Sequence, residues 1–478
     1  MSESRVIDQI LEMEIEFDLY DQKIDGVYFW ERYRFHLYDK LLNQLGFVAE
    51  SHHSPDLGPI NRIKIILSSF KNFIFKNPFV TRKTTDILFL GHQRRKLLED
   101  GLWWDIYTDP IIEYYLEHTK SKTLSLEFYQ KGSHLQPAKT NNLFYLDYLI
   151  FKANIRKMYF KRKFKLKPDE RNLLLKIRSY LQDKLGIEVN TIEDVSDILI
   201  LRRSYLPLFN KLLKKMKPSI AILVIGYANI REFFIDACKL NNIPTIELQH
   251  GIIHPDQLAY SYPEKQEKRC FADYLLTFGD FWNENIDFPI SKNFVYSVGY
   301  PFFEKKVNKF RDIIPEDQIL IISQGTVGIE LSRFAVDLSR KIKNFKIVYK
   351  LHPSEAEVWK EIYPELFVES QSGSIEVVSD HPALYYLFAK SKIQIGVSSF
   401  AIIEGLAFEL QTYLINYPET QFLNYLIEKQ IVHLVNSVDE LIEKIENPKA
   451  ADSNFRQNYF FKRNSLKNII DKIEDLRN

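Results

Sequence analysis

Two polar pairs in the second half of the sequence follow apolar runs typical of buried strands. His352 and Pro353 come after "FKIVYKL", and Ser398 and Ser399 come after "KIQIGV", just before the helical pattern "AIIEGLAFE". Proline disfavours a helical conformation in the residue before it, so His352 should be extended at the strand tip. Ser399 suits a helix N-cap, where a hydroxyl and free N–H groups can bind phosphate. A lone strand-end histidine is more often structural, but the second pair favours a shared phosphate site, where an imidazole can also protonate a leaving group.

Two further segments are expected beside this site. Glu404 lies in the helix after Ser399 and can accept hydrogen bonds from the hydroxyl groups of a ribose. The segment "SQGTVGIELS" follows another strand and places three residues at a helix start: Gln324, Gly325 and Thr326. It lacks the lysine and the spacing of a P-loop, so ATP hydrolysis is not indicated. Ser354 and Glu357 match the capping-box pattern S-x-x-E, which predicts a helix directly after His352.

The first half contributes a histidine and two aspartates that can act as a base. His250, in "IELQHGIIHP", follows a predicted strand, and Asp105 and Asp109 lie in "WWDIYTDP". A positioned imidazole or carboxylate can take a proton from an attacking hydroxyl group. His254 follows His250 at a metal-ligand spacing only if both lie on one helix, and Pro255 argues against that helix. No D-x-D triplet occurs anywhere in the sequence, so we expect no metal and no cofactor.

These positions require a frame of parallel strands. From Thr85 onward, short β-rich runs alternate with longer helical patterns, and the alternation starts again after the charged segment "PFFEKKVNKFRDIIPEDQ". This pattern predicts an α/β protein with two Rossmann-like domains. We predict a helical N-terminal extension (1–84), a first Rossmann-like domain (85–301), a linker (302–318), a second Rossmann-like domain (319–454) and a C-terminal helix (455–478) that returns to the first domain. Ligands bind outside the carboxyl ends of such strands, so all these sites should face one cleft.

The motifs of the second half resemble those of a known family. "YKLHP" and "GVSSFAIIEGLAF" are similar to the HP and SS motifs of bacterial GT-B glycosyltransferases that use CMP-activated acidic sugars, among them polysialyltransferases and capsule Kdo-transferases. Related patterns occur in the glycerophosphate polymerases of teichoic acid synthesis. The histidine and serines of those motifs contact the donor phosphate. The resemblance therefore implies the same role for His352, Ser398 and Ser399.

A motif of the first half extends the resemblance. "IELQHG" is similar to the His-Gly motif of the teichoic acid polymerases and to the QHG motif of the capsule transferases, whose histidine has been proposed as catalytic base. The resemblance implies that His250 is the base. The alternative is that His250 only shapes the acceptor pocket and that Asp105 or Asp109 is the base.

The resemblance also implies a reaction. The expected activity is metal-independent, inverting transfer of a sugar from a nucleotide-sugar, with a CMP-sugar favoured over a UDP- or GDP-sugar, to a surface polysaccharide or a lipid-linked acceptor. The second domain would bind the donor and the first domain the acceptor. One alternative is a sugar-nucleotide 2-epimerase of the same fold, which needs no acceptor. The other is a non-catalytic protein of polysaccharide assembly.

Composition restricts the class of protein further. Of the 478 residues 45% are hydrophobic, enough for each domain to bury a core. With 64 basic and 63 acidic residues, the net charge of +1 argues against a nucleic-acid-binding protein. Two cysteines are too few for a disulfide framework. The acidic start lacks the pattern of a secretory signal, and no apolar stretch approaches the ~20 residues that cross a bilayer, so we expect a cytoplasmic protein.

Two segments carry a local excess of positive charge. Residues 62–83 contain six basic residues and residues 152–167 contain eight, and neither segment has an acidic residue. Both are rich in aromatic residues. Such helices can lie on an anionic membrane, attracted by charge and held by rings at the interface. The alternative is a solvated helix face whose aromatic residues belong to the core. On the first interpretation the two segments share one surface and hold the protein peripherally on the inner face of the cell membrane.

Overall fold

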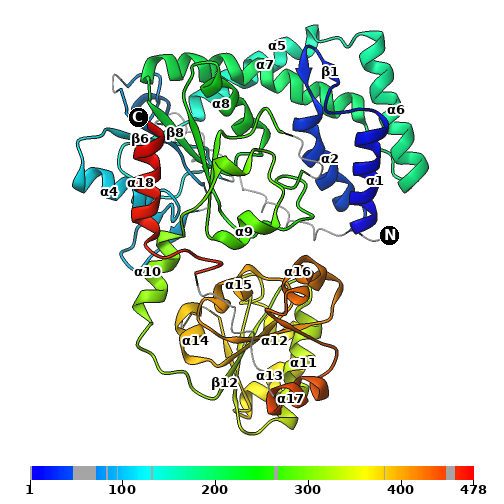
Figure 1. Cartoon of the computed structure of the whole chain (residues 1–478), viewed down its shortest axis with the longest axis vertical. Coiled ribbons are helices and arrows are strands. Elements are labelled where there is room, and N and C mark those ends of the chain that lie inside the picture. Colours follow the sequence, from blue (N-terminus) through cyan, green and yellow to red (C-terminus); the bar gives the residue numbers. More distant parts are fainter. Residues whose placement is uncertain are drawn as a thin grey trace. The chain divides into compact units, whose positions relative to one another are not determined.

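The computed structural model describes residues 3–46, 72–81, 84–93, 95–130, 133–262, 267–379, 381, 383–447 and 458–477. The chain divides into two compact units. The first unit comprises Met1–Thr277, Asn283–Val298 and Leu466–Asn478, and the second comprises Phe278–Trp282 and Gly299–Ser465. Each unit is built on a parallel sheet with helices around it, so the predicted class of two Rossmann-like domains is confirmed (Figure 1). The cleft expected between the domains stays a prediction.

The main sheet of the first unit has the strand order β11-β10-β9-β8-β3-β6-β7, and neighbouring strands are parallel. Its strands are β3 (Ile87–Leu90), β6 (Thr123–Glu127), β7 (Leu143–Tyr145), β8 (Ile220–Val224), β9 (Thr245–Leu248), β10 (Tyr274–Thr277) and β11 (Val295–Ser297). The chain runs outward from β3 to β6 and β7, and then from β8 to β11 on the other side. The direction reverses between β3 and β8, where an open sheet leaves a crevice at its carboxyl edge.

Helices surround this sheet. They are α4 (Asp109–His118), α5 (Asp147–Lys163), α6 (Pro168–Leu185), α7 (Thr191–Met216) and α8 (Asn229–Lys239), with the 3₁₀ turn η2 (Lys292–Phe294). Helix α9 (Asp280–Asn285) is shared, since its first three residues belong to the second unit and its last three to the first. Local signals set their ends. Helix α6 ends at Gly186 in the left-handed conformation, and the Asn190 side chain caps the start of α7. Two short antiparallel pairs, β1–β2 (Lys23–Ile24, Val27–Tyr28) and β4–β5 (Lys96–Leu97, Trp103–Trp104), lie outside the main sheet.

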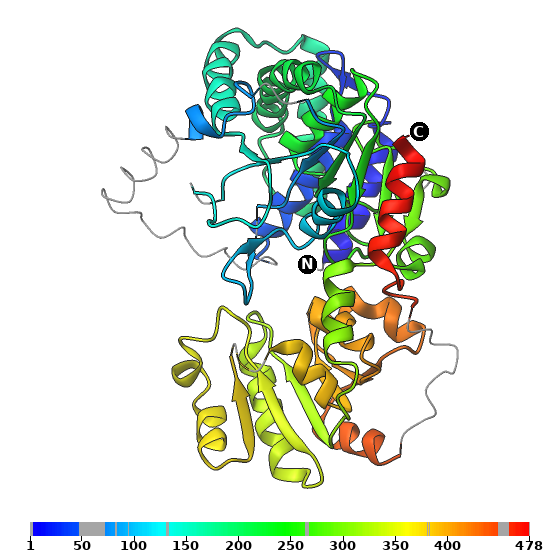
Figure 2. The ribbon, with the colours of Figure 1, turned by 90° about the vertical axis from the view of Figure 1, so that its left-hand side faces the viewer.

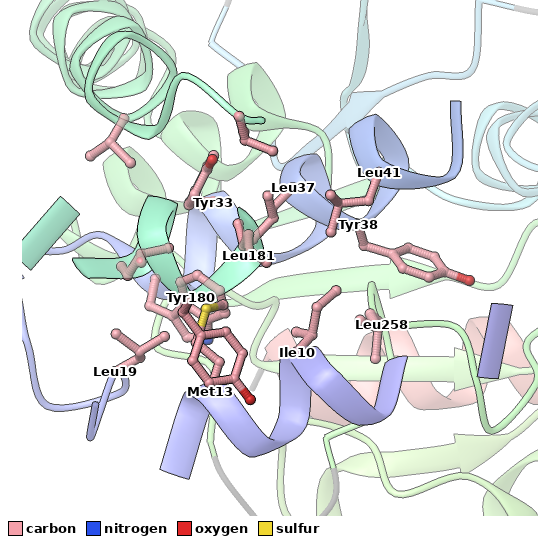
Figure 3. Close-up of a cluster of buried hydrophobic side chains, with 14 of the residues drawn as sticks. Ile10, Met13, Leu19, Tyr33, Leu37, Tyr38, Leu41, Tyr180, Leu181 and Leu258 are labelled. Atoms are coloured by element: carbon pink, nitrogen blue, oxygen red, sulfur yellow. The ribbon is translucent and has the colours of Figure 1, made fainter. Parts of the chain in front are cut away.

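The N-terminal helices α1 (Glu3–Glu16) and α2 (Trp30–Gln44) form the expected helical extension. Their apolar faces join α6 and the start of α7 in one hydrophobic core, with Leu258 from the segment between β9 and β10 (Figure 3). The labelled side chains show this mixing of distant segments: Ile10, Met13, Leu37, Leu41, Tyr180 and Leu181. The extension therefore belongs to the first unit and has no core of its own.

Buried polar side chains of α2 also hold the segment between β9 and β10. Arg34 donates hydrogen bonds to the carbonyl oxygens of Leu258 (2.6 Å) and Ser261 (2.9 Å). Glu31 accepts a hydrogen bond from Arg269 at 2.5 Å. Since His250 is the second residue of this segment, the extension fixes the chain that leaves a candidate site residue.

The last helix, α18 (Ser465–Arg477), packs on the first unit, as predicted (Figure 1, red). Its buried side chains Ile469, Ile470 and Ile473 share a core with Ile111, Ile112 and Tyr115 of α4 and with strands β3 and β8. The Tyr115 hydroxyl donates to Glu474 at 2.7 Å. The C-terminal segment thus returns to the first Rossmann-like domain.

The sheet of the second unit has the order β14-β13-β12-β15-β16-β17, again with parallel neighbours. Its strands are β12 (Gln318–Ile322), β13 (Lys346–Lys350), β14 (Ile375–Val378), β15 (Ile393–Gly396), β16 (Gln411–Ile415) and β17 (His433–Val435). The chain runs from β12 to β14 on one side and from β15 to β17 on the other. The reversal therefore lies between β12 and β15.

The helical elements of this unit complete the second Rossmann-like domain. They are α10 (Pro301–Lys309), α11 (Gly328–Lys341), α12 (Trp359–Ile362), α13 (Pro364–Gln371), α14 (Leu384–Lys390), α15 (Phe400–Leu406), η3 (Pro418–Leu423), α16 (Asn424–Glu428) and α17 (Val438–Glu446). Residues 302–318, expected as a linker, include most of α10 and belong to the second unit. In the parts of the chain that the structure describes, no helix is both long and apolar enough to cross a membrane.

Candidate functional site

The second unit gathers polar residues at the reversal of its strand order. Gln324 follows β12 and Ser398 follows β15, the two strands between which the chain direction changes. The Oε1 atom of Gln324 accepts hydrogen bonds from the backbone N–H and the hydroxyl group of Ser398, both at 3.2 Å. The Gln324 amide also donates to the Thr326 hydroxyl at 3.1 Å. The two predicted motifs therefore meet at the point of an open α/β sheet where ligands bind.

The loop after β13 brings His352 to the same edge. Its Nδ1 atom lies 2.7 Å from the Ser354 hydroxyl, and both His352 and Pro353 are exposed. A Cβ atom added at Gly325 would lie 3.7 Å from His352 Nδ1 and 3.0 Å from Ser354 Oγ. The loops that follow β12 and β13 therefore approach each other closely, and the glycine leaves room between them.

The capping box predicted for Ser354 and Glu357 is wrong. The residue that reaches back is Glu355, whose Oε2 atom accepts the backbone N–H of His352 at 2.7 Å. The other oxygen of this buried carboxylate accepts hydroxyl groups of Ser323 (2.9 Å) and Tyr363 (2.7 Å). Turns follow His352, and the next helix begins only at Trp359. Glu355 therefore fixes the backbone of His352 from beneath while the imidazole stays exposed.

The helix after Ser398 has the predicted start. Ser399 is the N-cap of α15, and its hydroxyl oxygen accepts the backbone N–H of Ala401 at 3.3 Å. Glu404 is buried in the same helix, and the Tyr385 hydroxyl donates to its carboxylate at 2.8 Å. Binding of a ribose by Glu404 stays a prediction.

The first unit places His250 at the carboxyl end of β9, beside the strand reversal of its own sheet. The Tyr107 hydroxyl donates to the carbonyl oxygen of His250 at 2.6 Å. Three rings surround the imidazole: His92 with 6.3 Å between ring centroids, Tyr227 with 6.0 Å and Tyr260 with 6.4 Å. They come from the segments after β3, β8 and β9, so three neighbouring strands build this aromatic cluster.

Asp105 and Asp109 stabilise the loops behind this cluster. Asp105 is buried and accepts the backbone N–H of His92 (2.7 Å) and the hydroxyl group of Thr108 (2.7 Å). Asp109 is buried too, and it accepts the backbone N–H of Asp105 (2.8 Å) and the hydroxyl group of Thr140 (2.5 Å). Burial and the neighbouring Asp105 raise the pKa of Asp109 to about 7. Both carboxylates thus have structural partners, whereas a base needs an oxygen that substrate can reach.

The loop after β8 has an unusual backbone. Ile225 has a φ of 65°, and a β-branched residue rarely adopts this left-handed conformation. Any other residue at the next position would displace the buried Glu247 side chain, because a Cβ atom at Gly226 would lie 2.2 Å from a Glu247 oxygen. Glu247 is buried in β9 and accepts the Gly226 N–H (2.8 Å) and the Tyr260 hydroxyl (2.5 Å). Burial raises the pKa of Glu247. Strained backbone of this kind is found mostly at functional sites.

The described residues offer no metal centre. No group of three or more His, Cys, Asp or Glu side chains within them could hold a metal ion. Burial lowers the pKa of His254 to about 4, so this imidazole is neutral at physiological pH.

Several residues of both clusters were not identified from the sequence. They are His92, Tyr227 and Tyr260 in the first unit and Glu355 in the second. His92 had a usable signal, because it follows the buried strand "ILFL" after one glycine. The others depend on contacts between segments distant in sequence, which no local pattern reveals.

Comparison with known proteins finds similarity in overall structure alone. No protein-family model matches the sequence, and no curated protein sequence matches it. One solved structure that resembles the chain is the UDP-GlcNAc 2-epimerase from Methanocaldococcus jannaschii, with 14% identity, a TM-score of 0.48 and a match that covers 81% of this chain and 99% of that chain. Another is the UDP-GlcNAc 2-epimerase from Neisseria meningitidis, with 16% identity, a TM-score of 0.47 and the same coverage of the two chains. The wall teichoic acid polymerase TagF also resembles it, with 13% identity, a TM-score of 0.44 and a match that covers 87% of this chain and 98% of that chain.

Proposed function

We propose that the protein is a glycosyltransferase that moves a sugar from a nucleotide-sugar to a polysaccharide or lipid-linked acceptor. The observation that carries this proposal is the pair of hydrogen bonds between Ser398 and Gln324 across the strand reversal of the second sheet. They place hydroxyl, amide and backbone groups at the edge where α/β proteins bind nucleotides, and His352 extends from the adjacent strand. A phosphate at this position is the ligand that best matches these donors.

In the proposed reaction each unit has one task. The bond between the anomeric carbon of the donor sugar and its phosphate oxygen breaks, and the electron pair leaves with the nucleotide. His352, Ser398 and Ser399 stabilise the charge that grows on that phosphate. The acceptor oxygen forms the new bond on the opposite face of the sugar, which inverts the anomeric centre, and its proton passes to His250. His250 is preferred to Asp105 because the Asp105 carboxylate is buried and already bonded.

The remaining assignments follow the same proposal. Gln324, Gly325 and Thr326 border the phosphate site, Pro353 holds His352 extended, and Glu404 binds the ribose. The donor is a CMP-sugar by preference and otherwise a UDP- or GDP-sugar, as the sequence motifs imply. No metal or cofactor takes part. We propose a cytoplasmic protein that attaches peripherally to the membrane.

Nucleotide binding tests the phosphate site directly. Bound to the native state alone, the correct nucleotide should raise the free energy of unfolding by about 2.7 kcal/mol at a hundredfold excess over its Kd. The measurement is the change in the unfolding temperature of the protein when cytidine, uridine, guanosine or thymidine nucleotides are added. Ser398→Ala should weaken binding about tenfold, because hydrogen bonds to charged groups contribute ~1.5–3 kcal/mol.

The matched control is Ser372→Ala. Ser372 is exposed and precedes β14, at the amino end of the same sheet, so its loss should leave the nucleotide Kd unchanged. If no nucleotide or nucleotide-sugar stabilises the wild type, the phosphate site is disproved. Turnover of a nucleotide-sugar to a free epimer with no acceptor present would instead identify a 2-epimerase.

An anionic membrane surface is the proposed second partner. Helix α5 exposes an apolar stripe of Phe151, Ile155, Met158 and Tyr159, with exposed fractions of 50–66%, among the basic residues of segment 152–167. Residues 72–76 lie beside it (Figure 2). The Phe73 ring is 5.7 Å from the Phe151 ring, centroid to centroid. Part of the first segment thus lies beside the second; residues 62–71, 82 and 83 lie outside the described residues. Apolar side chains ringed by positive charge are suited to an anionic lipid interface.

Co-sedimentation with liposomes tests this partner. We expect binding to vesicles that contain phosphatidylserine or phosphatidylglycerol, and loss of binding as salt rises, because screening shortens the range of the attraction. Ile155→Gln should weaken binding by removing an apolar contact. Leu175→Gln, on an exposed site of α6, is the control and should have no effect. Absence of binding at low salt would end the proposal.

A further inference from the structure

Arg231 differs from the other buried arginines of the first unit. Its side chain is only 6% exposed, and its Nη2 atom donates to Gln93 Oε1 at 2.6 Å. The guanidinium group lies over the Phe128 ring, 5.4 Å from its centroid. Among the residues that the structure describes, no carboxylate lies within ion-pair distance of it. By contrast the other three buried arginines each have an ion pair: Arg32 with Asp236, Arg34 with Glu14 and Arg95 with Glu127.

Arg231 also lies at the strand reversal of the first sheet. It belongs to the first turn of α8, after β8, and its partner Gln93 follows β3. Two carboxylates, Glu247 on β9 and Asp105, are near enough to act on its charge, but neither forms an ion pair with it. The Oε1 atom of Glu247 accepts the Gly226 N–H and the Tyr260 hydroxyl, and Asp105 accepts the His92 N–H and the Thr108 hydroxyl. Burial lowers the pKa of Arg231 to about 10, which leaves the guanidinium charged at neutral pH. A buried positive charge that makes no ion-pair contact is costly, so proteins seldom keep one without a use.

We propose that Arg231 is an oxyanion-binding subsite of the first unit, which takes a carboxylate or phosphate group of the ligand. A guanidinium group presents paired N–H donors that fit the two oxygens of such a group, and Gln93 fixes its orientation. In the proposed function this ligand is the acceptor, so the inference rests on that function in naming the ligand. The anion would lie near the aromatic cluster around His250, because Tyr227 of that cluster lies in the short loop before α8 and Arg231 lies in the first turn of that helix.

Stability gives a first test that separates a binding role from a structural one. If Arg231 serves to bind a ligand, Arg231→Gln removes a buried charge that forms no ion pair in the free protein. Its urea midpoint should then equal or exceed that of the wild type. If Arg231 is structural, the midpoint falls, as it does when a partner of a buried pair is removed. A clear fall in the urea midpoint would therefore overturn the proposal.

Anion binding gives the second test. The probes are sodium acetate and inorganic phosphate at constant ionic strength, followed by glucuronate and glycerol 3-phosphate to distinguish the two anion classes. Each is titrated calorimetrically into the full-length protein. We expect Arg231→Gln to weaken binding of whichever anion class the wild type binds more tightly, by at least tenfold. Arg231→Lys should weaken this binding less, because lysine keeps the positive charge. Lys120→Gln, an exposed site at the amino end of the same sheet, removes one charge without touching the subsite.

A third variant separates this inference from the proposed nucleotide site. Ser398→Ala should leave the Arg231-dependent binding intact, since it alters the second unit only. Loss of anion binding in Ser398→Ala but not in Arg231→Gln would place the anion at the phosphate site and refute the subsite. A protein that binds no nucleotide-sugar yet keeps Arg231-dependent anion binding would refute the proposed function while the subsite stands. Equal binding by wild type and Arg231→Gln also rejects the subsite.

Discussion

Replacement of His352 by alanine is expected to lower the rate of sugar transfer by about 10²-fold or more, with little change in stability. The imidazole is exposed, and its Nδ1 atom contacts the hydroxyl group (2.7 Å) and the backbone N–H (3.2 Å) of Ser354. Loss of such a surface group should cost about 0.5 kcal/mol of unfolding free energy. Charge grows on the leaving phosphate during the reaction, so a contact at that site matters most in the transition state. The rate should therefore fall much further than the stability.

The measurement compares turnover, nucleotide binding and urea unfolding in His352→Ala and His250→Ala. The first variant should bind nucleotide more weakly. The second should bind nucleotide normally but lose sugar-transfer activity, because the proposed role of His250 is to take the proton from the acceptor hydroxyl group. His118→Ala, an exposed histidine at the end of α4, is the control and should behave as the wild type. Full transfer activity in both variants would disprove the proposed roles.

Most features of the second unit that could be predicted from the sequence depend on local patterns. The strand-end proline, the alternation of strands with helices and the N-cap at Ser399 are all encoded within a few residues. Such signals act through backbone sterics and hydrogen bonds between near neighbours, so a single sequence reveals them. The same is true of α18, whose isoleucine spacing marks the face it buries.

Contacts between distant segments could not be predicted in this way. The hydrogen bonds from Ser398 to Gln324 depend on β12 and β15 being neighbours, which only the order of strands in the sheet decides. The capping-box pattern predicts Glu357 as the partner of the turn after His352, whereas the backbone N–H of His352 is accepted by Glu355, which the pattern does not include. Residue type alone makes Asp105 a candidate base, but it does not reveal that the carboxylate is buried and accepts the His92 backbone N–H, and its role as a base stays a prediction.

The N-terminal extension illustrates both what the sequence predicts and what it does not. The sequence indicated helices rich in aromatic residues, and α1 and α2 are helices. It gave no sign that polar residues on their inner faces, Glu14, Glu31 and Arg34, are buried. Charged side chains are mostly exposed, so a pattern of alternating charge and apolar residues is ordinarily assigned to a solvated face. Here those charges join the extension to the segment after His250.

Removal of one partner of the Glu14–Arg34 pair is expected to destabilise the first unit by about 3–5 kcal/mol. Arg34 is fully buried and Glu14 is 6% exposed, with 2.5 Å between Nε and Oε1. Glu14 also accepts the Trp30 indole N–H at 2.8 Å. Arg34→Leu leaves the Glu14 carboxylate buried without its counter-ion, and it frees two carbonyl oxygens of the segment after His250.

Urea unfolding of a double-mutant cycle measures this effect. Glu14→Leu with Arg34→Leu should cost less than the sum of the single replacements, because no unpaired charge is left behind. The control pair is Lys40 and Asp194, which lie 2.8 Å apart but are partly exposed, so Lys40→Met should cost no more than about 1 kcal/mol. A cost below that value for Arg34→Leu would show that the extension is not held by this pair. If the large cost is found, loss of transfer activity in the same variant has to be judged against its unfolded fraction, since Arg34 supports the chain that leaves His250.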